Sequence, residues 1–211
     1  MSEPSVFTVS SAPWSLEDLW LIAQGSATLQ LSPDKNYRSR LERGAALLRA
    51  GLERETPIYG VNTGYGESCL VRTPRELEHE LPIYLARFHG CGLGNHLSEI
   101  HSAAVVAARL CSLAKGYSGV RPEVLERLVT LVNLRLLPMI PEEGSVGASG
   151  DLTPLSYLAA VVMGERQVNY KSNILPAAKA LEQAGLQPLL LLPKETLAIM
   201  NGTTVMTALS A

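Results

Sequence analysis

Residues 144–155 read GSVGASGDLTPL, and the tripeptide Ala148-Ser149-Gly150 inside this run has the composition that a backbone needs to cyclise on itself. In such a ring the amide nitrogen of Gly150 bonds to the carbonyl carbon of Ala148, and only glycine permits so close an approach without a side-chain clash. Ser149 can then lose water and leave an exocyclic methylidene. The run therefore predicts a strong electrophile of a kind that the standard side chains do not provide.

Two plainer interpretations of the same run stay open. A loop rich in glycine and serine can simply precede a helix, with Thr153 as its N-cap and Pro154 as its first residue. A serine hydrolase with its nucleophile on a sharp turn would need glycine at position 151, where the chain has Asp151, and we expect no strand before the run. A serine hydrolase and a non-catalytic helical protein are therefore kept as alternatives.

Two further segments accompany residues 144–151, which we call the cyclising run. Residues 59–66 read YGVNTGYG, a glycine-punctuated loop with two tyrosines, and residues 200–203 read MNGT. Taken in this order, the three segments resemble the aromatic amino acid ammonia-lyases, which comprise histidine, phenylalanine and tyrosine lyases and related aminomutases. The resemblance extends over essentially the whole chain and is closest to the histidine ammonia-lyases. It implies that the prosthetic group 4-methylideneimidazole-5-one (MIO) forms autocatalytically from Ala148, Ser149 and Gly150.

The resemblance also implies a role for each motif residue. The substrate's amino group would attack the methylidene derived from Ser149, which makes the nitrogen a better leaving group. Tyr59 would remove the β-proton as the catalytic base. Asn201 would hydrogen-bond the ring or the substrate amine, and Asn62 and Gly66 are expected to lie at the substrate.

Some of these residues also have a purely structural interpretation, and other residues of the motifs are expected to shape the site. Without the other motifs, Tyr59 would be an ordinary loop tyrosine and Asn201 a helix-ending cap. Asn62 and Gly64 are expected to shape the Tyr59 loop, and Gly147 and Asp151 are expected to position the cyclising turn.

The pair Phe88-His89 bears on the substrate. By resemblance, His89 falls where histidine lyases place a histidine against the imidazole ring, and Phe88 falls where tyrosine-selective members carry a histidine. L-Histidine, giving urocanate, is therefore favoured. Because Phe88 and Gly90-Cys91 depart from the commonest histidine-lyase pattern, a tyrosine or phenylalanine lyase or aminomutase, giving coumarate or cinnamate, is the alternative. The purely structural interpretation makes His89 a half-buried histidine that is hydrogen-bonded to a backbone carbonyl, and Phe88 a core residue.

Composition restricts the partners and the compartment. The chain has 211 residues, is 46% hydrophobic and carries a net charge of −2, with no basic run that would suit nucleic acid. No apolar stretch reaches the ~18 residues of a membrane span. There is no lysine or arginine before Lys35 and no long apolar segment near the start, which argues against a signal or transit peptide. The odd cysteine count, Cys69, Cys91 and Cys111, suits reduced thiols in a cytoplasm.

A metal site is not expected. The sequence has neither a CxxC nor an HExxH pattern, and His96 and His101 are five residues apart, which places them on different helix faces. The expected partner is a small amino acid substrate.

The periodicity of apolar residues predicts an all-α fold with at most one small hairpin, in a single domain over residues 1–211. Capping and stop signals place the helices. Helices are expected from Ser15 (a capping box with Asp18) to Gly25, from Ser32-Pro33 with Leu41, Ala45, Leu48 and Leu52 on one stripe, from a Thr73–Glu76 capping box to Phe88, from Ser98 to Gly116, from Pro122 to about Leu137, from Pro154 to Met163, from Pro176 to Ala184, and in two pieces around Asn201, with a strand at Gln167–Tyr170.

The last residues, 205–211, read as a helix cut in mid-run, without a cap, a charge or a proline stop. By resemblance, family members are more than twice as long and form homotetramers, in which the Tyr59 loop of one subunit serves the Ser149 group of a neighbour. We therefore expect an N-terminal fragment of a longer lyase, catalytically inactive alone. Ring closure needs a backbone compressed by its surroundings, so whether MIO forms in such a fragment is left open.

Overall fold

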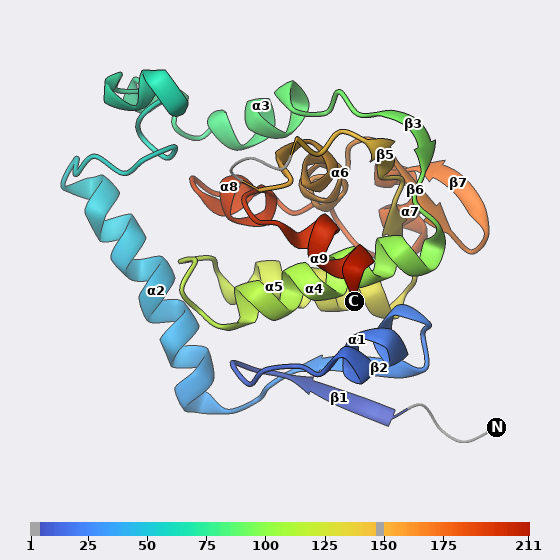
Figure 1. Ribbon diagram of the computed structural model, residues 1–211. Helices are drawn as coiled ribbons and strands as arrows, with labels where there is room; N and C mark the ends of the chain where they lie inside the picture. Colours follow the sequence, from blue (N-terminus) through green and yellow to red (C-terminus); the bar gives the residue numbers. More distant parts are fainter. Residues whose placement is uncertain (1–4, 147–149) are drawn as a thin grey trace.

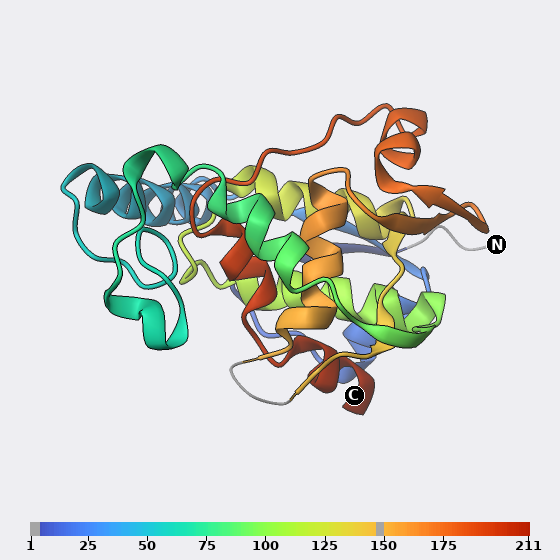
Figure 2. The ribbon, with the colours of Figure 1, turned by 90° about the horizontal axis from the view of Figure 1, so that it is seen from above.

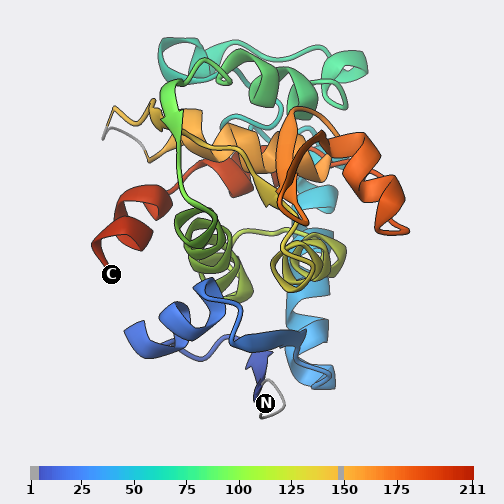
Figure 3. The same ribbon diagram turned by 90° about the vertical axis from the view of Figure 1, so that its right-hand side faces the viewer.

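Two long helices, α4 (Glu99–Ala114) and α5 (Pro122–Asn133), lie side by side at the centre of the computed structural model, which describes residues 5–146 and 150–211 (Figures 1 and 3). The Oγ atom of Ser98 caps α4 by accepting the backbone N–H of His101 at 3.2 Å. Leu110 of α4 and Leu128 of α5 are fully buried. Because a buried leucine contributes about 1.5–3 kcal/mol, this apolar pair is the core on which the other elements pack.

The N-terminal residues form a layer on one side of this pair (Figure 3). Strands β1 (Ser5–Val9) and β2 (Ala27–Leu31) are parallel and in register, and helix α1 (Leu16–Ala23) connects them. α1 packs on α4, and β2 packs on α5. The Asn133 side chain fixes β2 by accepting the Leu29 N–H and donating to the Leu29 carbonyl, both at 2.8 Å.

The opposite side of the core carries the residues of interest. α6 (Leu152–Val162) lies there with α3 (Leu81–Phe88) and α8 (Glu195–Met200), and α9 (Thr204–Ser210) packs between α6 and α4. α2 (Lys35–Glu53) runs along one edge, and residues 54–80 form a small lobe beside its end (Figures 1 and 2). The remaining elements are the short 3₁₀ helices η1 (Gly66–Leu70) and η2 (Arg75–Leu77), the antiparallel pair β3 (Leu93–His96) and β5 (Pro141–Glu143), the hairpin β6 (Gln167–Tyr170) and β7 (Asn173–Pro176) with β4 (Leu137–Pro138) at its edge, and α7 (Ala177–Gln183).

The mainly helical fold is confirmed, and several cap signals behave as the sequence predicts. Ser15 and Asp18 form a reciprocal capping box, with nitrogen–oxygen distances of 2.8 and 3.1 Å. Gly25, just past α1, has φ +78°, which glycine adopts most readily. The predicted strand at Gln167–Tyr170, the Pro176 helix and the break around Asn201 are also observed.

The expected capping box at Thr73–Glu76 is wrong. The Thr73 N–H bonds the Asn62 carbonyl, and an isolated bridge joins Thr63 to Arg72, so this segment is held by the loop before it. Only the short helix η2 follows, and α3 begins at Leu81.

Other boundaries shift, and the strand content exceeds one hairpin. α5 ends at Asn133 rather than Leu137, because residues 137–138 pair with β6. α2 begins after Asp34 rather than at Ser32-Pro33, and α6 begins after Asp151 rather than at Pro154. On the predicted α2 stripe, Leu41 and Ala45 are buried, whereas Leu48 and Leu52 are only half-buried. The short strand β5 does precede the cyclising run, contrary to expectation.

Candidate active site

The end of the cyclising run packs directly against the Asn201-Gly202 turn. Gly150 has φ +97°, and a Cβ built on it would overlap the Gly202 nitrogen and lie 3.0 Å from both the carbonyl carbon and the Cα atom of Gly202. The Asp151 N–H donates to the Gly202 carbonyl at 2.8 Å. Two of the three predicted motifs therefore meet backbone to backbone. Ala148, Ser149 and the neighbouring Gly147 lie outside the described residues.

Asp151 links the run to α9. Its side chain is 1% exposed, and its Oδ2 atom accepts the backbone N–H groups of Val205 at 2.7 Å and Met206 at 3.1 Å. Its Oδ1 atom accepts the hydroxyl of Ser145 at 2.5 Å. A carboxylate at the N-terminus of a helix satisfies orphan donors and suits the helix dipole. Asp151 thus joins Ser145 to the start of α9, and its role in positioning the turn stays a prediction.

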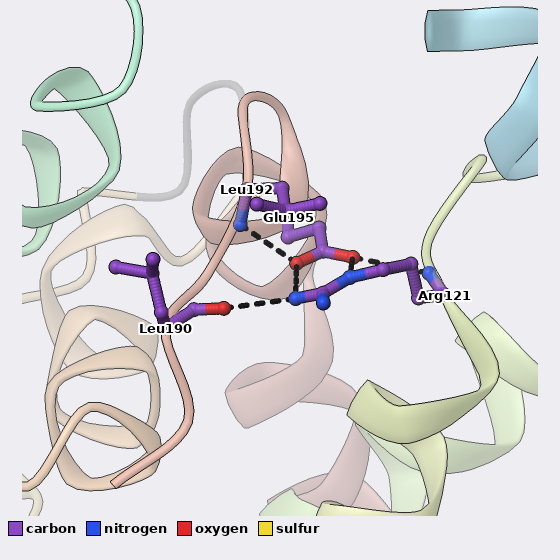
Figure 4. Close-up of polar contacts among 4 residues, drawn as sticks. All are labelled: Arg121, Leu190, Leu192 and Glu195. Carbon is purple, nitrogen blue, oxygen red and sulfur yellow. Dashed lines mark hydrogen bonds and ion pairs between the residues drawn. The ribbon is translucent and has the colours of Figure 1, made fainter.

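An ion pair anchors the first residue of α8, the helix that leads to Asn201 (Figure 4). The Glu195 side chain is 2% exposed and receives Nε and Nη2 of Arg121 at 2.9 and 2.8 Å. It also accepts the backbone N–H groups of Arg121 at 3.1 Å and Leu192 at 2.8 Å. The hydrogen bond to this carboxylate is the main cause that raises the pKa of Arg121. Buried charges with this many partners define a single geometry.

A second arginine, Arg109 of α4, holds the other end of α8. It is 5% exposed, and its Nη2 atom donates to the carbonyl oxygens of Ala198 and, at 3.1 Å, Asn201. Its Nη1 atom donates to the Thr204 hydroxyl at 3.4 Å. Sequence reasoning missed Arg109, although a lone arginine in the middle of an apolar helical run was a signal.

The Tyr59 loop is organised by its own residues. The Tyr59 ring is 57% exposed and packs edge to face with Tyr65, with 6.2 Å between ring centroids. The Gly66 N–H donates to the Tyr59 hydroxyl at 3.1 Å. A Cβ on Gly64 would lie 2.7 Å from the Ser68 carbonyl oxygen, in agreement with its predicted loop-shaping role.

Asn62 is buried within the same loop, with 2% exposure. Its Oδ1 atom accepts the Ile58 N–H at 2.8 Å, and its Nδ2 atom donates to the Thr56 carbonyl at 2.9 Å. These contacts make Asn62 a loop-forming residue. The substrate roles of Asn62 and Gly66 stay predictions.

Phe88 and His89 lie at the end of α3, with their rings edge to face and 5.2 Å between centroids. Phe88 is 82% exposed, so the core-packing interpretation is wrong. The Nδ1 atom of His89 lies 3.0 Å from the Leu85 carbonyl oxygen, which is the backbone contact that the purely structural interpretation predicts. Their role at the substrate stays a prediction.

The unusual Gly90-Cys91 pair has a structural explanation. Arg166 donates to the Gly90 carbonyl at 3.0 Å, and a Cβ on Gly90 would overlap the same guanidinium. The Cys91 Sγ atom lies 4.0 Å from the hydroxyl of Thr153, the second residue of α6. The end of α3 therefore lies against the start of α6, next to the cyclising run.

Two negative findings concern the described residues only. In residues 5–146 and 150–211, no three histidine, cysteine, aspartate or glutamate side chains are grouped to hold a metal ion. Over the same ranges, no helix combines the length and apolar character needed to cross a membrane.

A mainly helical chain that packs Gly150 onto an Asn-Gly turn has the architecture predicted for an ammonia-lyase. A family model described as aromatic amino acid lyase matches residues 14–211. The chain therefore belongs to the aromatic amino acid lyase family, a family that includes carbon–nitrogen lyases, and the predicted family is confirmed.

Individual relatives carry two kinds of name. The chain is 42% identical over 208 residues to a histidine ammonia-lyase of Myxococcus xanthus, covering 99% of this chain and 40% of that protein. It is 39% identical over 204 residues to an MIO-dependent tyrosine 2,3-aminomutase of Streptomyces globisporus, covering 97% and 38%. The chain thus spans about 40% of the length of the curated relatives that it matches.

Solved structures repeat this pattern. The tyrosine aminomutase from Streptomyces globisporus superposes with a TM-score of 0.89 at 38% identity, over 96% of this chain and 38% of that one. A histidine ammonia-lyase from Trypanosoma cruzi gives a TM-score of 0.85 at 29% identity, over 97% and 39%.

Proposed function

We propose that this chain supplies the electrophile and two catalytic side chains of an ammonia-lyase that converts L-histidine to urocanate. The observation that carries the proposal is the packing of Gly150 on Gly202, which places the amide that must cyclise beside the predicted catalytic Asn201. Family membership favours this function over a serine hydrolase.

The residues present fit an MIO group formed from Ala148, Ser149 and Gly150. Gly150 has a positive φ, and Gly202 occupies the place where its Cβ would lie. Asp151 fixes the chain immediately after Gly150. The groups that hold this turn, Asp151 and Arg109, both belong to this chain. We therefore propose that the ring forms here, where it would supply an electrophilic methylidene to the substrate's amino nitrogen.

Tyr59 is proposed to take the β-proton of the substrate. The N–H of Gly66 points at its hydroxyl oxygen, and a donor in this place stabilises negative charge on the phenolate oxygen, the form of the side chain that can accept a proton. The ring is largely exposed on an edge lobe, which suits a base that serves a neighbouring subunit of a homotetramer. Asn201 is proposed to hydrogen-bond the substrate amine from a turn held by Arg109.

His89 is proposed to contact the substrate ring. If its Nδ1–H donates to the Leu85 carbonyl, its Nε2 atom is an acceptor. Such an acceptor suits the N–H of an imidazole and also the O–H of a tyrosine. The second candidate function is therefore a tyrosine lyase or aminomutase, which the similarity to the Streptomyces globisporus enzyme favours.

The test uses a chimera in which residues 1–211 are followed by the part of the Myxococcus xanthus histidine ammonia-lyase beyond the matched region. The added part supplies catalytic groups that lie outside residues 1–211. We propose that residues 1–211 alone are inactive. We expect urocanate from L-histidine, no product from Ser149→Ala, and a loss of about 10²–10⁴-fold in kcat for Tyr59→Phe, the range for a general base.

Three results would contradict the proposal. Product from tyrosine with none from histidine would replace the substrate assignment by the second candidate. Unchanged turnover in Ser149→Ala would exclude the electrophile, and unchanged turnover in Tyr59→Phe would exclude the base.

A further inference from the structure

Arg109 is a buried cation whose observed partners are all neutral. Its contacts are the carbonyls of Ala198 and Asn201 and the Thr204 hydroxyl. None of the ion pairs found in residues 5–146 and 150–211 includes it, and its buried Nε atom has no hydrogen-bond partner there. Burial lowers its pKa to about 10. An arginine placed in this way costs folding free energy, so its retention calls for a compensating role.

The three acceptors bracket one short segment. Ala198 and Asn201 lie at the end of α8, and Thr204 is the first residue of α9. Gly202 lies between them, and a Cβ on it would overlap Nη1 of Arg109. The guanidinium therefore sets both the carbonyl directions and the closest approach of this turn.

The same turn touches the cyclising run. Gly202 occupies the space in which a Gly150 side chain would lie, and its carbonyl oxygen accepts the Asp151 N–H at 2.8 Å. A displacement of Gly202 would therefore move the Gly150 backbone. The path from Arg109 to Gly150 contains one intervening residue.

We infer that Arg109 is a positioning residue for ring closure: by holding the Asn201-Gly202 turn, it keeps the Gly150 amide in the compressed geometry from which the ring forms. This inference rests on the proposed function. In the closure, the Gly150 nitrogen bonds to the Ala148 carbonyl carbon, and the carbonyl oxygen leaves as water with the N–H hydrogens of Ser149 and Gly150. Ser149 then loses its hydroxyl and its Cα hydrogen as a second water, so no oxidant is needed. Holding reacting atoms close together is a recognised source of rate acceleration.

Two substitutions separate the role of the planar guanidinium group of Arg109 from that of its positive charge. Arg109→Lys keeps a positive charge, but a single ammonium cannot reproduce the planar array of donors that reaches three acceptors. Arg109→Met removes the charge and keeps an apolar stem. Val124→Ala in α5, at a fully buried position, is the control for lost stability.

The first readout is the intact mass of the whole chain after expression. Full ring formation removes two waters, about 36 Da. We expect this mass deficit in the parent chain and in Val124→Ala, and at least a tenfold smaller cyclised fraction in both Arg109 variants. A full deficit in Arg109→Lys and Arg109→Met would overturn the inference.

The second readout is hydrogen exchange at the Asp151 amide, measured in a Ser149→Ala background that cannot form the methylidene. We expect exchange about tenfold faster in both Arg109 variants, with Val124→Ala unchanged after correction for stability. Equal exchange in all four chains would overturn the inference. If the parent chain keeps its full mass, the proposed function fails in this chain, and the exchange rates still decide whether Arg109 holds the turn.

Discussion

The carboxylate of Asp151 offers a quantitative test of how the site is built. Asp151→Ala removes the acceptor for two backbone N–H groups at the start of α9 and for the Ser145 hydroxyl. Each hydrogen bond to a charged group contributes about 1.5–3 kcal/mol, and such losses are not fully additive. We therefore expect Asp151→Ala to lower the free energy of unfolding by about 4 kcal/mol.

Asp151→Asn is the matched variant. Its amide oxygen can still accept the two backbone N–H groups, and its amide nitrogen can donate to the Ser145 hydroxyl, so only the charge is lost. A helix-terminal charge contributes about 0.3–1 kcal/mol, and up to about 2 kcal/mol when partly buried. We therefore expect a loss of about 1 kcal/mol. Glu182→Ala, at an exposed position of α7, is the control.

The assay is urea unfolding followed by far-ultraviolet circular dichroism and by tryptophan fluorescence. Trp20 lines a groove with Ala208 and Leu209 of α9, so its emission reports the docking of that helix. With a slope of about 2 kcal/mol per molar urea, the midpoint should fall by about 2 M in Asp151→Ala and by about 0.5 M in Asp151→Asn. Equal shifts in the two Asp151 variants, or an Asp151→Ala shift no larger than that of Glu182→Ala, would refute the reasoning.

Three further predictions follow from other contacts. Glu195→Gln leaves the Arg121 guanidinium, only 24% exposed, without its counter-charge and should lower the free energy of unfolding by about 3 kcal/mol in urea titrations; a change within 0.5 kcal/mol of zero would contradict this. Gly185 has φ +71° in open space, so Gly185→Ala should cost about 1–2 kcal/mol, whereas Gly150→Ala adds a backbone clash and should lower the melting temperature at least twice as far; equal shifts would count against the clash. Burial raises the pKa of Tyr65 to about 12, so the difference in phenolate absorbance between the parent chain and Tyr65→Phe should titrate near pH 12; a difference curve centred near pH 10 would contradict it.

The Tyr65 shift also fixes the sign of a pH effect. A folded-state pKa above that of the unfolded chain means that the folded state holds the proton more tightly between about pH 10 and 12. The contribution of Tyr65 to stability is therefore fully present below pH 10 and is lost as the pH rises towards 12.

Local signals in the sequence predicted those parts of the fold that depend on neighbouring residues. The Ser15–Asp18 capping box and the Ser98 cap involve groups three residues apart, and both are observed. The parallel pair of β1 and β2 was missed because its register joins residues 22 positions apart, from Ser5 with Ala27 onwards. The Thr73 capping motif failed for a related reason, since the Asn62 carbonyl takes the Thr73 N–H from outside the motif.

The candidate site shows the same division. Linear motifs were sufficient to single out Tyr59, Gly150 and Asn201. They could not show that Gly150 lies on Gly202, nor that Arg109, more than 90 residues earlier in the chain, holds that turn. Such contacts depend on how α4, α8 and α9 pack together, which no local pattern encodes.

The central claim is that Ala148, Ser149 and Gly150 become an electrophilic ring, and the intact mass of the purified chain tests it most directly. We expect a mass about 36 Da below that of the sequence, and no such deficit in Ser149→Ala, which has no side-chain hydroxyl to lose as the second water. A parent chain that carries its full, unmodified mass would contradict the account, because the tripeptide would then be an ordinary turn.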